Sequence, residues 1–290
     1  MPNLFLTAHN PMFYLLMLFA LPSIAEPVVY NWPASNKSDP RGHYPIALLQ
    51  LALEKSDSDY LLLPSNRDQV QWRNLRQLEI GQGVDVVWTM TSIEREQKQL
   101  PVRIPIDRGL LGWRLLLIRQ QDTARFAEIN SAESLRKLRA VQGHDWPDLT
   151  ILQHNQFNVI PSTFYNGMFV MLQLGRVDYF PRALSEVYAE LNNHTTEQLA
   201  IADSLALYYP APLYYFVRPD KPALAQAIEQ GLQRAIADGS MQQLFMQHFA
   251  TAISAAKLSN RHIIRLENPL LPEATPLQDS RLWFNPEVGY

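Results

Sequence analysis

Short apolar runs alternate with stretches of helical periodicity along the first third of the chain. Apolar residues run over 28–32, 60–63 and 84–88, and each run has the length of a buried strand. Residues 45–55 and 70–80, which lie between these runs, carry apolar residues at helical spacing. The order strand, helix, strand, helix, strand predicts a βαβαβ unit with a parallel sheet.

A second series of alternating segments follows residue 109. The apolar run 110–118 predicts a long strand that carries the chain from a first lobe into a second one. Pro210 and Pro212 interrupt the apolar run 205–217 and indicate a bend or a change of sheet. The remaining predicted elements cover residues 140–143, 158–160, 165–174, 182–191, 223–238 and 241–249.

These segments predict an α/β protein of two lobes, each a mainly parallel sheet flanked by helices. The predicted division is a first lobe over 26–112, a second lobe over 113–212, a return to the first lobe over 213–259, and an extended, proline-containing tail over 260–290.

In the second lobe the chain passes from a helix to a strand at a glycine. Gly175 can end the helix 165–174 with a positive φ, and residues 177–180 then form a short buried strand. Pro181 removes a backbone donor and ends the strand. Arg182 is therefore expected just beyond the carboxyl end of the strand, where open α/β sheets place ligands.

The first lobe repeats this arrangement. The strand 84–88 is followed by a polar loop that contains Thr91, Ser92 and Arg95. Two lobes that each end a strand in a polar loop with an arginine predict a ligand cleft between them.

The amino-terminal segment differs from the rest of the chain. A run of roughly ten apolar residues is broken by Pro22 and followed by Ser23-Ile24-Ala25, the small-x-small pattern that signal peptidase accepts. The run is shorter than the roughly 20 apolar residues of a membrane-spanning helix. We therefore expect residues 1–25 to be a secretory signal cleaved after Ala25 and the mature protein to be periplasmic. An uncleaved anchor or a buried helix is the alternative.

The composition and the absence of certain motifs argue against several classes of function. The 290 residues are 47% hydrophobic, enough for substantial cores, and the net charge of -3 argues against a nucleic-acid partner. There is no cysteine, so disulfides and thiol chemistry are excluded. The histidines form no pair at metal-ligand spacing, and no nucleophile elbow or phosphate-binding glycine loop occurs. We expect no metal, no cofactor and no enzymatic activity.

The order of three motifs resembles that of extracellular solute-binding proteins of the amino-acid-binding type, family 3. The first motif is the loop Thr91-Ser92-Ile93-Glu94-Arg95, and the second is Gly175-Arg176-Val177-Asp178. The third runs from 217 to 240 and looks like the carboxyl-terminal helix and glycine stop of that family. The resemblance covers residues 26–250 and implies a type II periplasmic binding protein fold, in which two α/β lobes are joined by two crossover strands.

The resemblance also implies residue roles. Arg95 would bind the ligand carboxylate, with Thr91 or Ser92 beside it, and a planar guanidinium suits this task. The family places an aspartate for the ligand amine a few residues after its Gly-Arg-x-Asp strand, but this chain has Phe180-Pro181-Arg182 there. That departure argues against an ordinary α-amino acid. Two arginines facing the cleft would favour an anionic ligand, whereas Arg182 could instead pair with Glu186 on its own helix.

The loop from 143 to 148 is a further candidate. A helix amino terminus there could receive an anion, with His144 and Asp145 beside it and Trp146 stacking on a flat ligand. The alternative is an ordinary helix start capped by Asp145. Trp32 and Tyr165 are candidates for an aromatic pocket wall, although aromatic residues beside strands are more often core.

Together these observations predict a monomeric periplasmic binding protein. It would close two lobes over a small polar, anionic or amino-acid-like ligand and serve an ABC transporter or a sensor in the inner membrane. One alternative is an exported dehydratase-like enzyme on the same fold, with Glu186, Asp145 or His144 as its acid or base. Another is a protein-interaction module in which the tail is the working surface.

Overall fold

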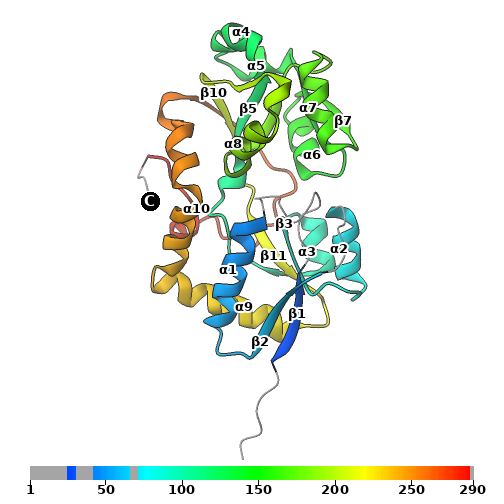
Figure 1. The fold of residues 1–290 in the computed structure, drawn as a ribbon, viewed down its shortest axis with the longest axis vertical. Coiled ribbons are helices and arrows are strands. Elements are labelled where there is room, and N and C mark those ends of the chain that lie inside the picture. Colours follow the sequence, from blue (N-terminus) through cyan, green and yellow to red (C-terminus); the bar gives the residue numbers. More distant parts are fainter. Residues whose placement is uncertain (1–24, 31–41, 66–70, 288–290) are drawn as a thin grey trace, which may run out of the picture.

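Two lobes, each built around its own sheet, make up the computed structural model of the chain (Figure 1). The structure describes residues 25–30, 42–65 and 71–287. Most of the predicted signal peptide and the candidate Trp32 lie outside these residues. The two-lobed α/β fold class predicted from the sequence is confirmed.

Lobe 1 contains a five-stranded sheet in the order β2-β1-β3-β11-β4. Its strands are β1 (Glu26–Tyr30), β2 (Tyr60–Pro64), β3 (Val86–Met90), β4 (Leu100–Val102) and β11 (Leu213–Val217). The strands β1, β2 and β3 pair in parallel, as the βαβαβ pattern predicted. β11 returns from lobe 2 and pairs antiparallel with both β3 and β4. The carboxyl end of β3 therefore points toward lobe 2.

The helices of lobe 1 cover both faces of this sheet. They are α1 (His43–Glu54), α2 (Gln71–Glu79), α3 (Ile93–Lys98) and α9 (Pro222–Ala237). The apolar stripe of α1, which includes Leu48, Leu49 and Ala52, is buried against α9. Figure 1 shows α1 and α9 on one side of the sheet and α2 and α3 on the other.

Lobe 2 is built around a sheet with the order β12-β10-β5-β8, with β9 also paired to β5 and β6 paired to β7. Its strands are β5 (Trp113–Arg119), β6 (Arg139–Gly143), β7 (Asn158–Ser162), β8 (Phe180–Ala183), β9 (Leu199–Ile201), β10 (Leu205–Tyr208) and β12 (His262–Arg265). The pairing is mixed, and the predicted mainly parallel sheet is wrong for lobe 2, because β5 pairs antiparallel with β8, β9 and β10. β5 enters the lobe and β10 leaves it, so these two crossover strands pair antiparallel, whereas β6 with β7 and β10 with β12 are parallel.

The helices of lobe 2 are α4 (Thr123–Ala127), α5 (Ala132–Arg136), α6 (Pro147–His154), α7 (Tyr165–Gln173) and α8 (Leu184–Asn193). Gly175 follows α7 with φ +69°, as predicted. The predicted strand over residues 177–180 is wrong in its bounds, because β8 begins only at Phe180 and ends at Ala183. Before this strand, Tyr179 bridges Ala140 of β6 in parallel. Asp178 accepts hydrogen bonds from the backbone N–H and the guanidinium of Arg139, at 2.8 and 3.3 Å.

Two segments cross between the lobes as the sequence indicated. The first joins β4 to β5, and the second joins β10 to β11 through Pro210 and Pro212. The predicted change of sheet at these prolines is confirmed, because β10 belongs to the sheet of lobe 2 and β11 to that of lobe 1.

A third connection is formed by α10 (Ser240–Ala256). This helix packs against α1 and α9 of lobe 1 and against α8 of lobe 2, and Figure 1 shows it running along both lobes. The chain then enters lobe 2 as β12, whose four residues pair with β10. The prediction of an extended tail from residue 260 is therefore wrong for residues 262–265, which complete the sheet of lobe 2. Within the described residues, no helix is long and apolar enough to cross a membrane.

The rest of the tail returns to lobe 1 and to the first crossover. The amide of Ile93 at the start of α3 donates to the carbonyl of Leu270 at 3.0 Å, and the amide of Phe284 donates to that of Arg108 at 2.7 Å. Phe284 is buried in the main core, and the ring of Trp283 lies over Gly109. Gly109 has φ +74°, and a Cβ atom there would lie 2.5 Å from Cε3 of Trp283. The tail thus packs on the crossover at a point where only glycine fits.

A pair of glycine substitutions tests this contact. Gly83 has φ +72° and nothing within 4 Å of an added Cβ. Alanine at position 83 would therefore have the same backbone strain as alanine at position 109, but no clash with a neighbouring side chain. We expect Gly83→Ala to lower the free energy of unfolding by about 1 kcal/mol through strain alone. Gly109→Ala should cost about 1–3 kcal/mol more, because the Trp283 ring must move. Chemical denaturation measures both, and equal losses in the two variants would contradict the packing described here.

Candidate functional site

A cavity of about 800 Å³ lies between the lobes. Lobe 1 contributes residues at the carboxyl end of β3, including Trp88, Thr89 and Met90, together with Trp72 of α2. Lobe 2 contributes residues from the loop after β6, from β8 and from α8. The helix α10 contributes His248 and Phe249. The predicted cleft is therefore present, and elements of both lobes build its walls.

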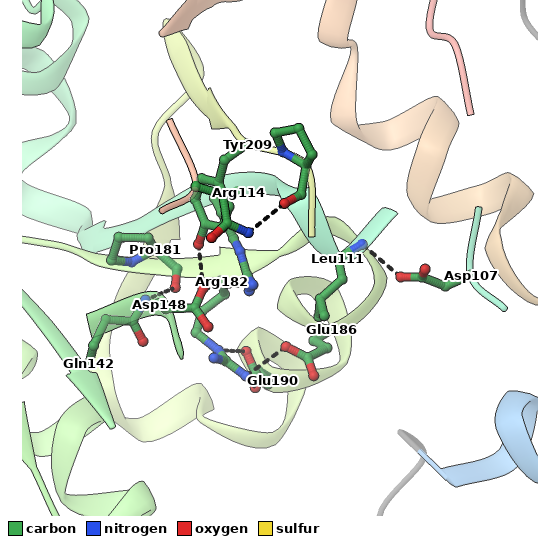
Figure 2. Close-up of polar contacts among 12 residues, drawn as sticks. Asp107, Leu111, Arg114, Gln142, Asp148, Pro181, Arg182, Glu186, Glu190 and Tyr209 are labelled. Atoms are coloured by element: carbon green, nitrogen blue, oxygen red, sulfur yellow. Dashed lines mark hydrogen bonds and ion pairs between the residues drawn. The ribbon is translucent and has the colours of Figure 1, made fainter. Parts of the chain in front are cut away.

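Arg182 is buried in the lobe 2 wall. It is the third residue of β8 and pairs with Leu115 of β5, so its predicted place beyond the end of a strand is wrong. Its Nη2 lies 2.5 Å from Oε1 of Glu190 and 2.8 Å from Oε2 of Glu186, and its Nε donates to Oε2 of Glu190 at 2.7 Å (Figure 2). Burial alone would lower the pKa of Arg182, but the carboxylates of Glu190 and Glu186 raise it well above its ordinary value. The alternative pairing with Glu186 is present, with Glu190 as a second partner.

The guanidinium of Arg182 also lies against aromatic rings. Its Cζ is 4.8 Å from the ring centre of Trp146 and 4.9 Å from that of Phe180. The hydroxyl of Tyr165 donates to Oε1 of Glu190 at 2.6 Å. Trp146 and Tyr165 thus line the cavity as predicted candidates, and one side of each is occupied by the ion-pair cluster around Arg182.

Arg114 is a second buried arginine in the same wall. It is the second residue of β5, and its Nη2 lies 2.6 Å from Oδ1 of Asp148 in the first turn of α6 (Figure 2). The hydroxyl of Tyr209 donates to the same carboxylate. Burial would lower the pKa of Arg114, but the charge of Asp148 raises it instead. We did not single out Arg114 from the sequence, although one arginine within the apolar run 110–118 indicates a buried charge with a partner.

The loop between β6 and α6 brings His144, Asp145 and Trp146 to the cavity. The amide of His144 donates to the carbonyl of Ser162 at 2.9 Å, and the ring of Trp146 packs on Gly143. The helix α6 begins with Trp146 as its N-cap and Pro147 in the first turn. Asp145 precedes the N-cap, so the alternative in which Asp145 caps this helix is wrong.

Three of the predicted site residues do not line the cavity, namely Arg95, Thr91 and Ser92. Their side chains form hydrogen bonds within residues 89–96. Arg95 Nη1 donates to Oγ1 of Thr89 at 2.9 Å and to the carbonyl of Met90 at 2.6 Å. Thr91 Oγ1 donates to Oε1 of Glu96 at 2.7 Å, and Ser92 caps α3 by accepting from the amide of Arg95.

The charge of Arg95 nevertheless acts across the cleft. Burial lowers its pKa to about 10, while the carboxylates of Asp145 and Asp148 in lobe 2 raise it. Arg95 therefore lies behind the lobe 1 wall, within electrostatic reach of the lobe 2 wall. A ligand role for Arg95, Thr91 and Ser92 stays a prediction.

Asp107 lies at the first crossover, where the cavity meets the hinge. Its carboxylate accepts from the amides of Gly109 at 3.0 Å and Leu111 at 2.7 Å (Figure 2). Burial raises its pKa to about 7, against the lowering effect of these backbone hydrogen bonds and of Arg114. Within the described residues, no group of three or more histidine, cysteine, aspartate or glutamate side chains could hold a metal ion.

Comparisons with known proteins agree on the fold. No family model and no curated protein matches the chain. The arginine-specific periplasmic binding protein STM4351 of Salmonella typhimurium aligns with a TM-score of 0.57 at 18% identity, over 78% of this chain and 100% of its own. The probable amino-acid ABC transporter binding protein ytmK of Bacillus subtilis aligns with a TM-score of 0.58 at 18% identity, over 78% of this chain and 99% of its own. The VFT2 domain of BvgS from Bordetella pertussis aligns with a TM-score of 0.59 at 18% identity, over 76% of this chain and 93% of its own. The chain has the two-lobed type II periplasmic binding protein fold, as its motifs predicted.

The raised pKa of Asp107 leads to a prediction about stability and pH. The folded-state pKa of about 7 lies above the ordinary value of 3.8, so the folded protein retains a proton that the unfolded chain releases. The stability gained from this proton is complete below about pH 4 and is lost as the pH rises to about 7. We expect the free energy of unfolding of the wild type, relative to Asp107→Asn, to decrease across this window and to level off above it.

Urea unfolding at intervals from pH 4 to pH 8 measures this difference. The hydrogen bond from Arg281 lowers the pKa of exposed Asp279, so Asp279→Asn provides a control that should show no decrease across the same window. Parallel profiles of the wild type and Asp107→Asn would show that the pKa of Asp107 is the same in the folded and unfolded states, against the environment described here.

Proposed function

We propose that this chain is an exported solute-binding protein that captures a small polar, amino-acid-like ligand between its lobes. The interlobe cavity carries the proposal, because it joins polar and aromatic groups of two lobes that are connected by crossover segments. Its volume of about 800 Å³ falls within the range of small-molecule sites. A ligand that contacts both walls favours the closed arrangement by the difference in contact energy between the open and closed states.

The neighbouring structures support this function by analogy of fold. They include a protein with high arginine specificity, an ancestral arginine-binding protein bound to glutamine, and a protein of glutathione import. We therefore propose a periplasmic location, an amino-acid-like ligand, and an ABC importer or a sensor as the partner that reads the closed state. A monomeric state and cleavage after Ala25 complete the proposal.

Two carboxylates of the cavity wall are paired with arginines, which favours binding over catalysis by these two groups. Glu186 and Asp148 are committed to ion pairs with Arg182 and Arg114, which leaves neither carboxylate placed to exchange protons freely with a substrate. The interaction module based on the tail has less support, because Phe284 and its neighbours pack on the chain's own crossover.

A ligand screen with a blocked cleft tests the proposed function. Ala189 of α8 lines the cavity, so a tryptophan at this position should fill it. In a thermal-shift screen against amino acids, small peptides, dicarboxylates, keto acids and amines, we expect one class to stabilise the wild type and not Ala189→Trp. A ligand at a hundred times its dissociation constant adds about 2.7 kcal/mol to the free energy of unfolding.

The matched control is Ala223→Trp, which makes the same change at an exposed position at the start of α9. This variant should respond to the ligand as the wild type does. Stabilisation that survives in Ala189→Trp would place the ligand outside the cavity, and the proposed function would then be wrong.

A further inference from the structure

The charged groups of the lobe 2 wall are arranged in two layers. The guanidinium groups of Arg114 and Arg182 form the inner layer, with side chains 2% and 3% exposed. Carboxylates form the accessible layer, since the side chains of Asp145 and Glu186 are 26% and 21% exposed. A solute that enters the cavity therefore reaches carboxylates before it reaches either arginine.

Asp145 differs from the other carboxylates of this wall. Asp148 and Glu186 each lie within 2.8 Å of a guanidinium nitrogen. The carboxylate of Asp145 accepts no hydrogen bond from the described residues, and its only ion-pair partner among them is His144, whose Nδ1 is 3.6 Å away. An acceptor-only group that lines a cavity and accepts no hydrogen bond from the described part of the chain is suited to receive a donor from a ligand.

The opposite wall is aromatic. Trp88 and Trp72 of lobe 1 line the same cavity, and Trp72 is 52% exposed. Faces of tryptophan rings attract cations through the ring quadrupole. Lobe 1 thus offers π-faces, and lobe 2 offers a carboxylate that forms no ion pair with an arginine among residues 25–30, 42–65 and 71–287.

From these observations we propose that the cleft binds an organic cation, a ligand with an amine or guanidinium group, and that Asp145 is the residue that selects it. The ammonium or guanidinium N–H groups would donate to the Asp145 carboxylate, and the apolar part of the ligand would pack on Trp88 and Trp72. This inference rests on the proposed binding function and gives the ligand the opposite charge to the one that the two arginines suggested from the sequence.

The internal ion pairs explain why Arg114 and Arg182 do not favour an anion. A ligand carboxylate could reach Arg182 only by displacing Glu186 or Glu190, and it could reach Arg114 only by displacing Asp148. Each displaced carboxylate would lose a charge-assisted partner in a buried place, which is costly. An anion in the open part of the cavity would instead lie beside Asp145 and Glu186.

Calorimetric titration with matched probes tests the proposal. Phenethylamine, phenethyl alcohol and hydrocinnamate share one apolar skeleton and carry a positive, a neutral and a negative group. Agmatine and cadaverine extend the series to aliphatic cations, and arginine adds a cation that also carries a carboxylate. We expect binding of the cationic probes, with affinity at least about tenfold above that of their neutral and anionic counterparts.

Variants at one position separate charge from shape. Asp145→Asn should weaken the binding of the amines at least about tenfold, because it removes a charge-assisted hydrogen bond and keeps the volume. Asp145→Glu keeps the charge and should retain most of the affinity. Glu133→Gln, an exposed carboxylate on α5 paired with Lys137, removes the same charge outside the cavity and should bind as the wild type does.

The outcomes distinguish this inference from the proposed function. If neutral or anionic probes bind best, and Ala189→Trp blocks them while Asp145→Asn does not weaken them, the cleft is a binding site and the inference about charge is wrong. If no cationic probe binds, the inference is wrong, and the ligand screen still decides the proposed function. If binding is unchanged in Ala189→Trp, the ligand lies outside the cavity, and the proposed function and the inference are both wrong.

Discussion

The need to pair two buried guanidinium groups organises lobe 2 of this protein. A buried arginine without a carboxylate would be strongly destabilising, so Arg114 and Arg182 fix the positions of the elements that supply their partners. Arg114 of β5 holds the first turn of α6 through Asp148, and Arg182 of β8 holds α8 through Glu186 and Glu190. These two helices and the loop before α6 form the wall of the cleft. The shape of the site and the charge that it presents therefore follow from the same ion pairs.

The connections between the lobes set the conditions for closure. Besides the two crossovers, α10 packs on both lobes and leads into β12, and the tail returns from lobe 2 to Ile93 and Arg108 of lobe 1. Any closing motion must keep these contacts or exchange them for others of similar energy. Trp283 on Gly109 and the buried carboxyl group of Asp107 both lie at the first crossover, so packing and charge are concentrated where the chain would bend.

Local patterns in the sequence predicted much of the fold. The βαβαβ unit, the glycine after α7 and the change of sheet at Pro210 and Pro212 depend on periodicity and on backbone chemistry, which act over a few residues. The predicted start of β8 was wrong because residues 178 and 179 pair with β6, a strand distant in sequence, and the pairing with β5 begins only at Phe180. The strand β12 was missed because a four-residue edge strand has little pattern of its own, and its partner β10 lies more than fifty residues earlier.

The candidate site was predictable in its location but not in its chemistry. Arg182, His144, Asp145, Trp146 and Tyr165 all line the cavity, as the ends of strands and helices suggested. The sequence could not show that Glu190 neutralises Arg182, because Arg182 lies in β8 and Glu190 in α8, and the pair forms only when the helix packs against the strand. Nor could it show that Arg95 turns back to Thr89 and Met90. Tertiary pairing decides which charges face the ligand, and such pairing cannot be predicted from the pattern of a single sequence.

The distance between the lobes with and without a ligand tests the central claim most directly. The chain has no cysteine, so spin labels at Gln97→Cys on α3 of lobe 1 and Gln153→Cys on α6 of lobe 2 would report only on these two exposed positions (Figure 1). If the protein captures its ligand by closure, the probe with the largest thermal shift shortens the distance between the two labels, and Ala189→Trp abolishes the change. A ligand that binds without changing this distance would contradict capture between closing lobes.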